Sequence, residues 1–355
     1  MASLDSPRAP DTRSPEPLTG SRAAGRPSPP RLSSAWLRFA GRRLAGLVAI
    51  FLALLVVSFL IVQLIPGDPA VGVAGANADL ADVQRVRSEL GLDQPIWQRF
   101  LDHVGGVLSG DLGTSFMYRQ QVETIVVNRL PFTATIAVAG ILVVLLISVP
   151  LGMAVGVLTR GGRRKWMDVA FGMVTGFLDS IPGYIMASFL VVMFALGIGL
   201  VPLLPPAYTP RFGAASFVLP VAAIAIGPVC TISRVVRREM AVVLDADYMR
   251  TARGWRLPAL RRHVRWALPN LLTSTLTLSG LILTGMIGGA IIIESVFALP
   301  GLGSGIIKAI LDRDYPVIQG MVLVIGMIAA LVNLLVDVLL GLIDPRTLGG
   351  SHVSA

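Results

Sequence analysis

Residues 234–270 read RVVRREMAVVLDADYMRTARGWRLPALRRHVRWALPN and form a basic stretch between two long apolar runs. The stretch holds nine arginines and three acidic residues, whereas the runs 212–233 and 266–293 hold no charged residue. Each run is long enough to cross about 30 Å of hydrocarbon as a helix. A polar, helix-prone segment between two such spans lies at a membrane face, and its arginine density indicates the cytoplasmic face. We therefore expect this stretch to be presented to a partner.

The composition of the whole chain is that of a membrane protein. Its 355 residues are 54% hydrophobic and 14% charged, and the mean hydropathy is +0.73. A soluble domain carries roughly 25% charged residues. The net charge of +9 comes from basic residues in the segments that flank apolar runs, which does not favour nucleic-acid binding. The single cysteine, Cys230, excludes an internal disulfide framework, and the three histidines are scattered.

Six apolar runs predict an all-α membrane protein with six transmembrane helices. The runs are 44–65, 130–159, 169–200, 212–233, 266–293 and 315–336. Basic residues concentrate before the first run, between the second and third, and between the fourth and fifth. Because arginine and lysine favour the cytoplasmic side, we expect both termini to lie in the cytoplasm.

The expected organisation follows from these runs. Its parts are a disordered cytoplasmic tail (1–35), the first transmembrane helix (36–66), an extracytoplasmic loop (67–129), a transmembrane core (130–346) with the loop 234–265, and a cytoplasmic C-terminal tail (347–355). The first tail is rich in Pro, Ser, Arg and Gly, a composition that does not fold alone; a misassigned start codon is the alternative. Within the extracytoplasmic loop we expect surface helices at 83–92 and 95–108 and a turn at 111–113.

The chain shows no sequence signature of catalysis. A phosphate-binding loop of the Walker type needs a lysine directly after a glycine. The two lysines, Lys165 and Lys308, are not in that context, and the glycine-rich run 301–305 is expected to be a turn or hinge. No nucleophile–base set and no metal-ligand spacing is present, so we expect no catalytic residue, no metal site and no cofactor in this chain. Energy for any transport comes from a partner or an ion gradient.

Three acidic residues lie within or beside the apolar runs, where charge is costly and usually functional. Asp179 lies inside the third run and Glu294 ends the fifth, so both are candidates for a pathway or gate. The alternative for each is an interfacial acid or a hydrogen bond between helices. Asp337 more simply marks the membrane boundary.

Motifs across residues 42–346 resemble one known family. They are SFLIVQLIPGDPA (58–70), ELGLDQPIWQRF (89–100), GDLGTSF (110–116), NRLPFTATIAVAG (128–140), DSIPGYI (179–185), ESVFALPGLGSGIIKAILDRDYPVIQG (294–320) and NLLVDVLLGLIDPR (333–346). In this order they resemble the integral-membrane permease subunit of the dipeptide/oligopeptide/nickel branch of bacterial ABC importers. The resemblance implies a type I ABC importer permease (MetI-like) fold, with 130–346 as its core, in the bacterial plasma (inner) membrane.

The segment DADYMRTAR (245–253) resembles the so-called EAA loop of that family, which implies a coupling helix that docks on a cytoplasmic ATPase subunit. The implied coupling residues are Asp247, Tyr248, Met249, Arg250, Thr251, Ala252, Arg253 and Gly254. We expect Asp247 to cap this helix, with Asp245 as a competing cap, and Tyr248, Met249 and Ala252 to form an apolar docking ridge. The alternative is that the arginines only satisfy the positive-inside rule at lipid headgroups.

After Arg253 the chain departs from the family pattern, which usually continues with alanine, lysine and glycine. Here the residues are Gly254, Trp255 and Arg256. Either two residues are missing and Gly254 is the motif glycine, or Arg256 occupies the glycine position. We favour Gly254 because glycine ends a helix readily with a positive φ.

The resemblance implies a permease subunit that forms half of the translocation pathway for peptides or a similar small solute. Its implied partners are a second permease subunit (as a heterodimer), two cytoplasmic ATPase subunits that bind ATP and Mg²⁺, and an extracytoplasmic substrate-binding protein. The main alternative is an ion-gradient-driven secondary transporter, which usually shows inverted repeats with broken helices. A membrane-anchored sensor would not need six spans.

Overall fold

The computed structural model describes residues 32–64, 68–75, 78–89, 91–195 and 204–343. These residues form helices and connecting loops, and their only extended pairing is an isolated bridge between Thr114 and Gln121. Five helical segments are long and apolar enough to cross a membrane, and one bent helix pair makes a sixth when counted as one span. The predicted all-α membrane fold is confirmed.

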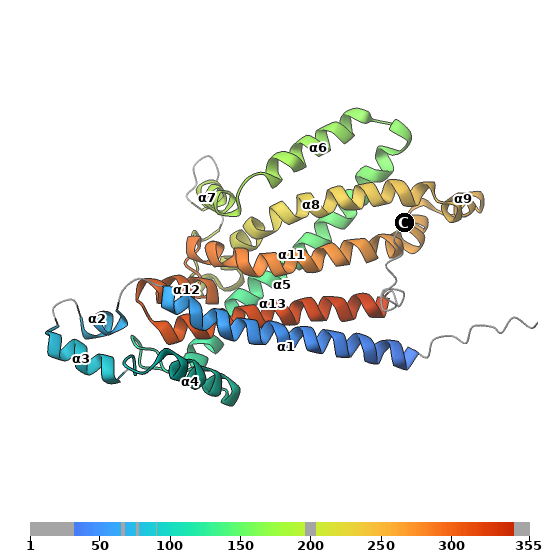
Figure 1. Cartoon of the computed structure of the whole chain (residues 1–355). Coiled ribbons are helices and arrows are strands. Elements are labelled where there is room, and N and C mark those ends of the chain that lie inside the picture. Colours follow the sequence, from blue (N-terminus) through green and yellow to red (C-terminus); the bar gives the residue numbers. More distant parts are fainter. Residues whose placement is uncertain (1–31, 65–67, 76–77, 90, 196–203, 344–355) are drawn as a thin grey trace, which may run out of the picture.

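The continuous spans are α1 (Leu32–Leu64), α5 (Val122–Leu158), α8 (Val218–Asp245) preceded by the 3₁₀ turns of η2 (Pro210–Phe217), α11 (Leu268–Val296) and α13 (Tyr315–Ile343). These apolar runs form helices because hydrocarbon offers no hydrogen-bond partner to backbone N–H and C=O groups, and a helix pairs these groups internally. In Figure 1, the axes of α1, α13, α11 and α8 are roughly aligned, and α5 crosses them. The helix pairs α5–α8, α1–α13, α8–α11 and α11–α13 are in contact.

The third predicted span is not one helix. Instead of a continuous run over 169–200, the structure has α6 (Lys165–Asp179) and α7 (Gly183–Phe194), which meet at an angle of 96°. Pro182 lies at the break, where it offers no backbone N–H and disfavours a helical conformation of Ile181. Residues 196–200 of the prediction lie outside the described residues.

Two other helices begin earlier than expected. α1 starts at Leu32, four residues before the predicted boundary at 36, and α5 starts at Val122, eight residues before 130. The start of α5 is helical because Val122, Ile125 and Val126 are buried against other helices, despite the nearby charges. The remaining tail residues, 1–31 and 347–355, lie outside the described residues.

The described part of the segment between α1 and α5 contains three short helices. The expected pair are α3 (Leu80–Glu89) and α4 (Ile96–Ser109); α2 (Pro69–Ala74) was not predicted, although Asp68 caps it by accepting from the Ala70 N–H at 2.9 Å. α4 packs against the end of α1, where the rings of Phe59 and Phe100 are 5.2 Å apart. The expected turn at 111–113 is present, since Asp111 Oδ1 accepts from the Gly113 N–H at 2.8 Å.

Different short helices lie at the two ends of the bundle. The helices α2, α3, α4 and α12 (Leu302–Leu311) lie at one end, called here the α4 end. At the opposite end, the α9 end, lie α9 (Asp247–Gly254) and the turn between α5 and α6 (Figure 1). At this end Arg43 of α1 pairs with Asp337 of α13, with Nη1 and Oδ2 2.7 Å apart. Asp337 thus ties the two helices together near their ends.

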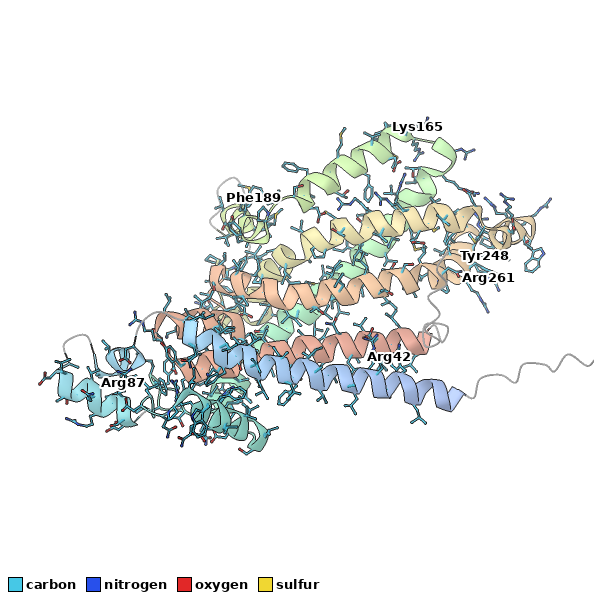
Figure 2. The ribbon with its side chains drawn as sticks, in the orientation of Figure 1. Arg42, Arg87, Lys165, Phe189, Tyr248 and Arg261 are labelled. Carbon is cyan, nitrogen blue, oxygen red and sulfur yellow. The ribbon has the colours of Figure 1, made fainter. Side chains whose placement is uncertain are left out.

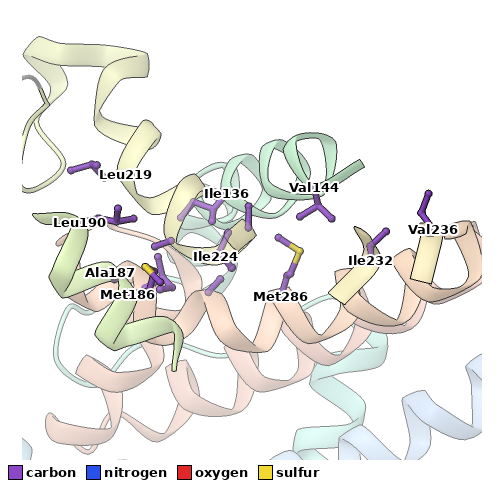
Figure 3. Close-up of a cluster of buried hydrophobic side chains, with 14 of the residues drawn as sticks. Ile136, Val144, Met186, Ala187, Leu190, Leu219, Ile224, Ile232, Val236 and Met286 are labelled. Atoms are coloured by element: carbon purple, nitrogen blue, oxygen red, sulfur yellow. The ribbon is translucent and has the colours of Figure 1, made fainter. Parts of the chain in front are cut away.

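Buried apolar side chains form two clusters. The larger joins α5, α7, α8 and α11, and Figure 3 shows part of it, with Ile136, Ile224 and Met286 near its middle. The smaller joins the first turns of α5 to α1, α12 and α13 through residues such as Val122, Leu302 and Met321. The bundle therefore has two packing units that share α5.

Small residues allow α5 and α8 to approach closely. A Cβ added to Gly152 would lie 2.5 Å from the Ser233 carbonyl oxygen, and one added to Gly156 would lie 2.9 Å from Met240 Cβ. The two glycines are spaced i, i+4, as in the small-residue motifs that bring membrane helices together. Since lipid tails are as apolar as the side chains, this close packing stabilises the pair more than burial does.

We predict that Gly152→Ala lowers the free energy of unfolding of the detergent-solubilised protein by about 1–3 kcal/mol, because the new methyl group displaces the backbone of α8. The melting temperature should fall accordingly. Gly172→Ala in α6 is the matched control, since nothing lies within 4 Å of its added Cβ. Both variants replace a glycine by an alanine within a helix, so the gain in intrinsic helix propensity is the same in each. Equal melting temperatures for the two variants would contradict the proposed packing.

Candidate functional site

The basic stretch that separates the fourth and fifth spans is only partly a loop. We expected a loop over 234–265, but its first twelve residues continue α8 as far as Asp245. Val236, Met240 and Val243 recur at helical spacing and are buried, so an apolar face continues beyond the last uncharged residue. The arginines of this part occupy the other face of the same helix.

The helix α9 begins without the predicted cap. Its N-cap residue is Ala246, and no side chain accepts from the first turn. Asp247 is the first helical residue, where its carboxylate is 97% exposed and lies 3.4 Å from Arg250 Nη1. A carboxylate in the first turn still interacts favourably with the helix dipole. Asp245 pairs instead with Arg160, with Oδ1 2.6 Å from Nη2.

The expected coupling residues divide between two faces of α9. Met249 and Ala252 are buried, each 1% exposed, in packing against α8. The predicted apolar ridge is therefore wrong for these two residues, and only Tyr248 is exposed. Arg253 Nη2 donates to the Leu244 carbonyl at 3.1 Å, which holds the end of α9 against α8.

The end of α9 shows which residue adopts the left-handed conformation. Gly254 is the last helical residue and has no positive φ, whereas Arg256 has a φ of 51°. The preference for Gly254 as the left-handed residue is therefore wrong. Arg256 takes the left-handed position, and its N–H donates to the Arg253 carbonyl at 2.9 Å. Such a conformation is uncommon for a residue with a Cβ.

The exposed surface of α9 contains charged, polar and aromatic groups. Tyr248, Arg250 and Thr251 are exposed, and Trp255 is 65% exposed just beyond the helix. The short α10 (Ala259–Arg262) follows and adds the exposed Leu260. Figure 2 shows Tyr248 and Arg261 together at the α9 end. Trp255 and Leu260 were missed in the sequence, although exposed apolar residues in a basic segment are a usable signal.

Two titratable groups at this end are shifted towards their neutral forms. Partial burial raises the pKa of the Tyr248 phenol, which stays protonated. Partial burial, and then the nearby Arg262 guanidinium, lower the pKa of His263. His263 opens the π-helical turn His263–Ala267 that leads into α11. The positive charge of this region at neutral pH is therefore carried by its arginines.

Within the described residues, three ion pairs connect α8 to the segment before it. Arg160 in the α5–α6 turn pairs with Asp245, Asp168 in α6 pairs with Arg237, and Asp179 at the end of α6 pairs with Arg234 at 2.5 Å. Each pair is partly exposed, where a single bridge is worth little. Their partners on α8 are, in chain order, Arg234, Arg237 and Asp245. The three pairs therefore follow one edge of α8 from the middle of the bundle to the α9 end.

Asp179 lies where the α6–α7 break meets α8. Besides the Arg234 pair, its Oδ1 accepts from Thr231 Oγ1 at 2.9 Å. Asp179 and Thr231 form part of the wall of a cavity of about 560 Å³ between α7, α8 and α11. Tyr184 and Gly227 also line this cavity. The sequence prediction of Asp179 as a pathway residue remains a hypothesis, to which this cavity gives a location.

Glu294 is fully buried at the junction of α5, α11 and α12. Its Oε1 accepts from Thr133 Oγ1 at 2.6 Å and its Oε2 from the Ser304 N–H at 3.0 Å. The run 301–305, expected as a turn or hinge, is the start of α12, and a Cβ on Gly301 would lie 2.3 Å from the Glu294 carboxylate. Glu294 therefore fixes α12 against the bundle.

A second buried carboxylate was not identified in the sequence. Asp314, just before α13, is 0% exposed and accepts from the Phe116 N–H at 3.0 Å and the Met117 N–H at 3.3 Å. It also bonds to Ser115 Oγ. The contact joins the segment between α1 and α5 to the start of α13 across about 200 residues, a pairing that no local pattern reveals.

The helical bundle, with five apolar spans and one broken span, is that of a multi-pass membrane protein. A family model described as "binding-protein-dependent transport system inner membrane component" matches residues 148–349, and the corresponding N-terminal model matches residues 36–137. The chain belongs to this family, and it is a permease subunit of an ABC importer in the inner membrane.

Individual proteins support the assignment. A protein named as a peptide transport system permease of Brucella suis is 36% identical over 308 residues, or 86% of this chain and 97% of that protein. The glutathione transport system permease protein GsiC of Salmonella typhimurium is 34% identical over 315 residues, or 87% and 98%. A solved structure of the inward-facing MetNI methionine ABC transporter covers 62% of this chain and 97% of its own with a TM-score of 0.51; at 15% identity it supports the fold alone.

We predict that Asp314→Asn loosens the segment around residues 115–117, because hydrogen bonds to a charged group contribute about 1.5–3 kcal/mol each. Hydrogen exchange of the Phe116 and Met117 amides measures this directly and should become faster. Asp312→Asn, two residues away and without these bonds, is the control. Unchanged exchange in Asp314→Asn would show that the carboxylate does not hold this segment.

Proposed function

We propose that this chain forms half of the translocation pathway of an importer for peptides or a similar small solute. The names of its relatives support this substrate class, since they are a peptide and a glutathione permease. We also propose that the α9 end, with both termini, faces the cytoplasm. The concentration of arginines at 160–165 and 250–265 supports that orientation.

The observation that carries the proposal is α9, a short helix held on α8 with its other face exposed. Tyr248 and Arg250 of α9, the exposed Trp255 just beyond it and Leu260 of α10 together form what we call the coupling surface. Arginine and large aromatic residues are enriched at the energetic centres of protein interfaces. The coupling surface is the proposed contact with a cytoplasmic ATPase subunit. ATP and Mg²⁺ are bound there and not by this chain, which is not itself an enzyme.

Packing allows a displacement of α9 to reach the membrane. Met249 and Ala252 are buried against α8, and Arg253 bonds to the Leu244 carbonyl. The ion pairs of Asp168 and Asp179 then attach α6 to α8. We infer that α6, α8 and α9 move as one body when the ATPase subunits bind ATP, which favours one of two arrangements of the bundle.

The cavity beside Asp179 is the proposed part of the pathway in this subunit. It lies against α8 and α7, so movement of α8 changes its shape. Its wall combines apolar side chains with the carboxylate of Asp179 and the hydroxyl of Thr231. Glu294, the other gate candidate, is assigned the role of holding α12 in place.

The proposed assembly contains a second permease subunit, forming a heterodimer, together with two ATPase subunits and an extracytoplasmic substrate-binding protein. The α4 end would receive the binding protein, since it lies opposite the coupling surface. In that arrangement the binding protein delivers the solute and largely determines which solute is carried.

Proteoliposomes containing the complete transporter test this function. With the binding protein and a labelled peptide outside, uptake should require ATP in the lumen with the ATPase subunits. A proton gradient without ATP should give none. Uptake that persists on a proton gradient after the ATPase subunits are removed would instead establish a secondary transporter.

We predict that Arg250→Glu weakens retention of the ATPase subunits roughly 30-fold, the equivalent of about 2 kcal/mol at an interface hot spot. Arg85→Glu in α3 is a closely matched control. Arg85 is 67% exposed and pairs with an aspartate three residues earlier, as does Arg250 at 68%. Co-purification at graded salt measures the loss. An equal loss in both variants would contradict the coupling surface.

A further inference from the structure

A second large cavity lies between α5, α6 and α8, and it shares Leu178 and Ile226 with the wall of the Asp179 cavity. Its volume is about 610 Å³, and its walls are almost entirely apolar. Trp166, Ala170 and Val174 line it from α6, Leu151 from α5 and Val229 from α8. Trp166 and Val174 are 71% and 58% exposed, so the cavity is a groove open along the surface. We call it the α6 groove.

The length of the α6 groove fits a lipid chain. Its α6 wall runs from Trp166 to Leu178. At about 1.5 Å per residue this wall is about 18 Å long. One leaflet of a hydrocarbon core is about 15 Å deep.

Unpaired cations lie at one end of the groove. Arg163, Arg164 and Lys165 directly precede Trp166, and all three are exposed. None forms an ion pair within the described residues, whereas their neighbour Arg160 pairs with Asp245. Figure 2 places Lys165 at the start of α6, apart from Tyr248 and Arg261 of the α9 region. These cations are therefore a separate charged site from the coupling surface.

An apolar groove with cations at one end is chemically complementary to an anionic lipid. Basic sites between transmembrane helices bind anionic lipid headgroups. Arginines also donate paired hydrogen bonds to phosphate oxygens. An indole at the mouth, as at Trp166, is typical of the interfacial layer between headgroups and hydrocarbon.

We propose that the α6 groove binds an anionic phospholipid, with an acyl chain between α6 and α8 and the phosphate at Arg163, Arg164 and Lys165. The lipid would fill the space beside the ion pairs of Asp168 and Asp179 and so hold α6 against α8. The site takes a ligand other than the substrate and lies apart from the coupling surface.

Native mass spectrometry of the complete transporter tests the proposal, with dioleoylphosphatidylglycerol and dioleoylphosphatidylcholine as probes. The phosphatidylglycerol should be retained preferentially. The double variant R163Q/R164Q should weaken its binding roughly 30-fold, since each basic residue near an anionic lipid contributes about a factor of five. R261Q/R265Q removes two exposed arginines away from the groove and should leave binding unchanged.

Filling the groove gives a second test. Ala170→Phe projects into it and should reduce the bound phosphatidylglycerol, whereas Val169→Phe, on the exposed neighbouring position that does not line the groove, should not. Equal retention of the two lipids, or equal loss in R163Q/R164Q and R261Q/R265Q, would overturn the proposal. Efficient cross-linking of Ala170→Cys to the second permease subunit would do so too, since a partner helix would then cover the groove.

Discussion

The close contact between α5 and α8 is the constraint on which the other helices depend. Gly152 and Gly156 leave no room for a side chain at the point where α8 passes. Because hydrophobic burial does not drive helix association within lipid, such packing of small residues carries much of the specificity. It places α8 in the larger apolar cluster, and α8 in turn positions both the Asp179 cavity and α9.

The proposed mechanism uses α8 as a mechanical connection because its two ends have different surroundings. Its middle lies beside the cavity, and its far end carries α9 through Met249 and Ala252. Individually, partly exposed ion pairs contribute little to stability. Their use here is geometric, since pairs with Asp168 and Asp179 hold α6 at a fixed position along α8. The second apolar cluster, around α1 and α13, can then serve as the frame against which this body moves.

Composition and periodicity were enough to predict the membrane class, the helical fold and five of the spans, because hydrocarbon imposes helices of a minimum length. The local sequence signal for the break in the third span is Pro182, which offers no backbone N–H. The faces of α9 were not predictable, because burial of Met249 depends on how α9 folds back on α8. Arg256 in the left-handed position contradicted a sound local preference, and Asp314 bonds across the chain, beyond any local pattern.

A distance measurement in the complete transporter tests the rigid connection most directly. Spin labels at Val242 of α8, Met173 of α6 and Leu335 of α13 occupy exposed positions, in a background with Cys230 replaced by alanine. Pairwise distances are measured by pulsed electron paramagnetic resonance with and without ATP bound to the ATPase subunits. We predict an unchanged 242–173 distance and a shifted 242–335 distance. A 242–173 shift as large as the 242–335 shift would show that α6 and α8 do not move together.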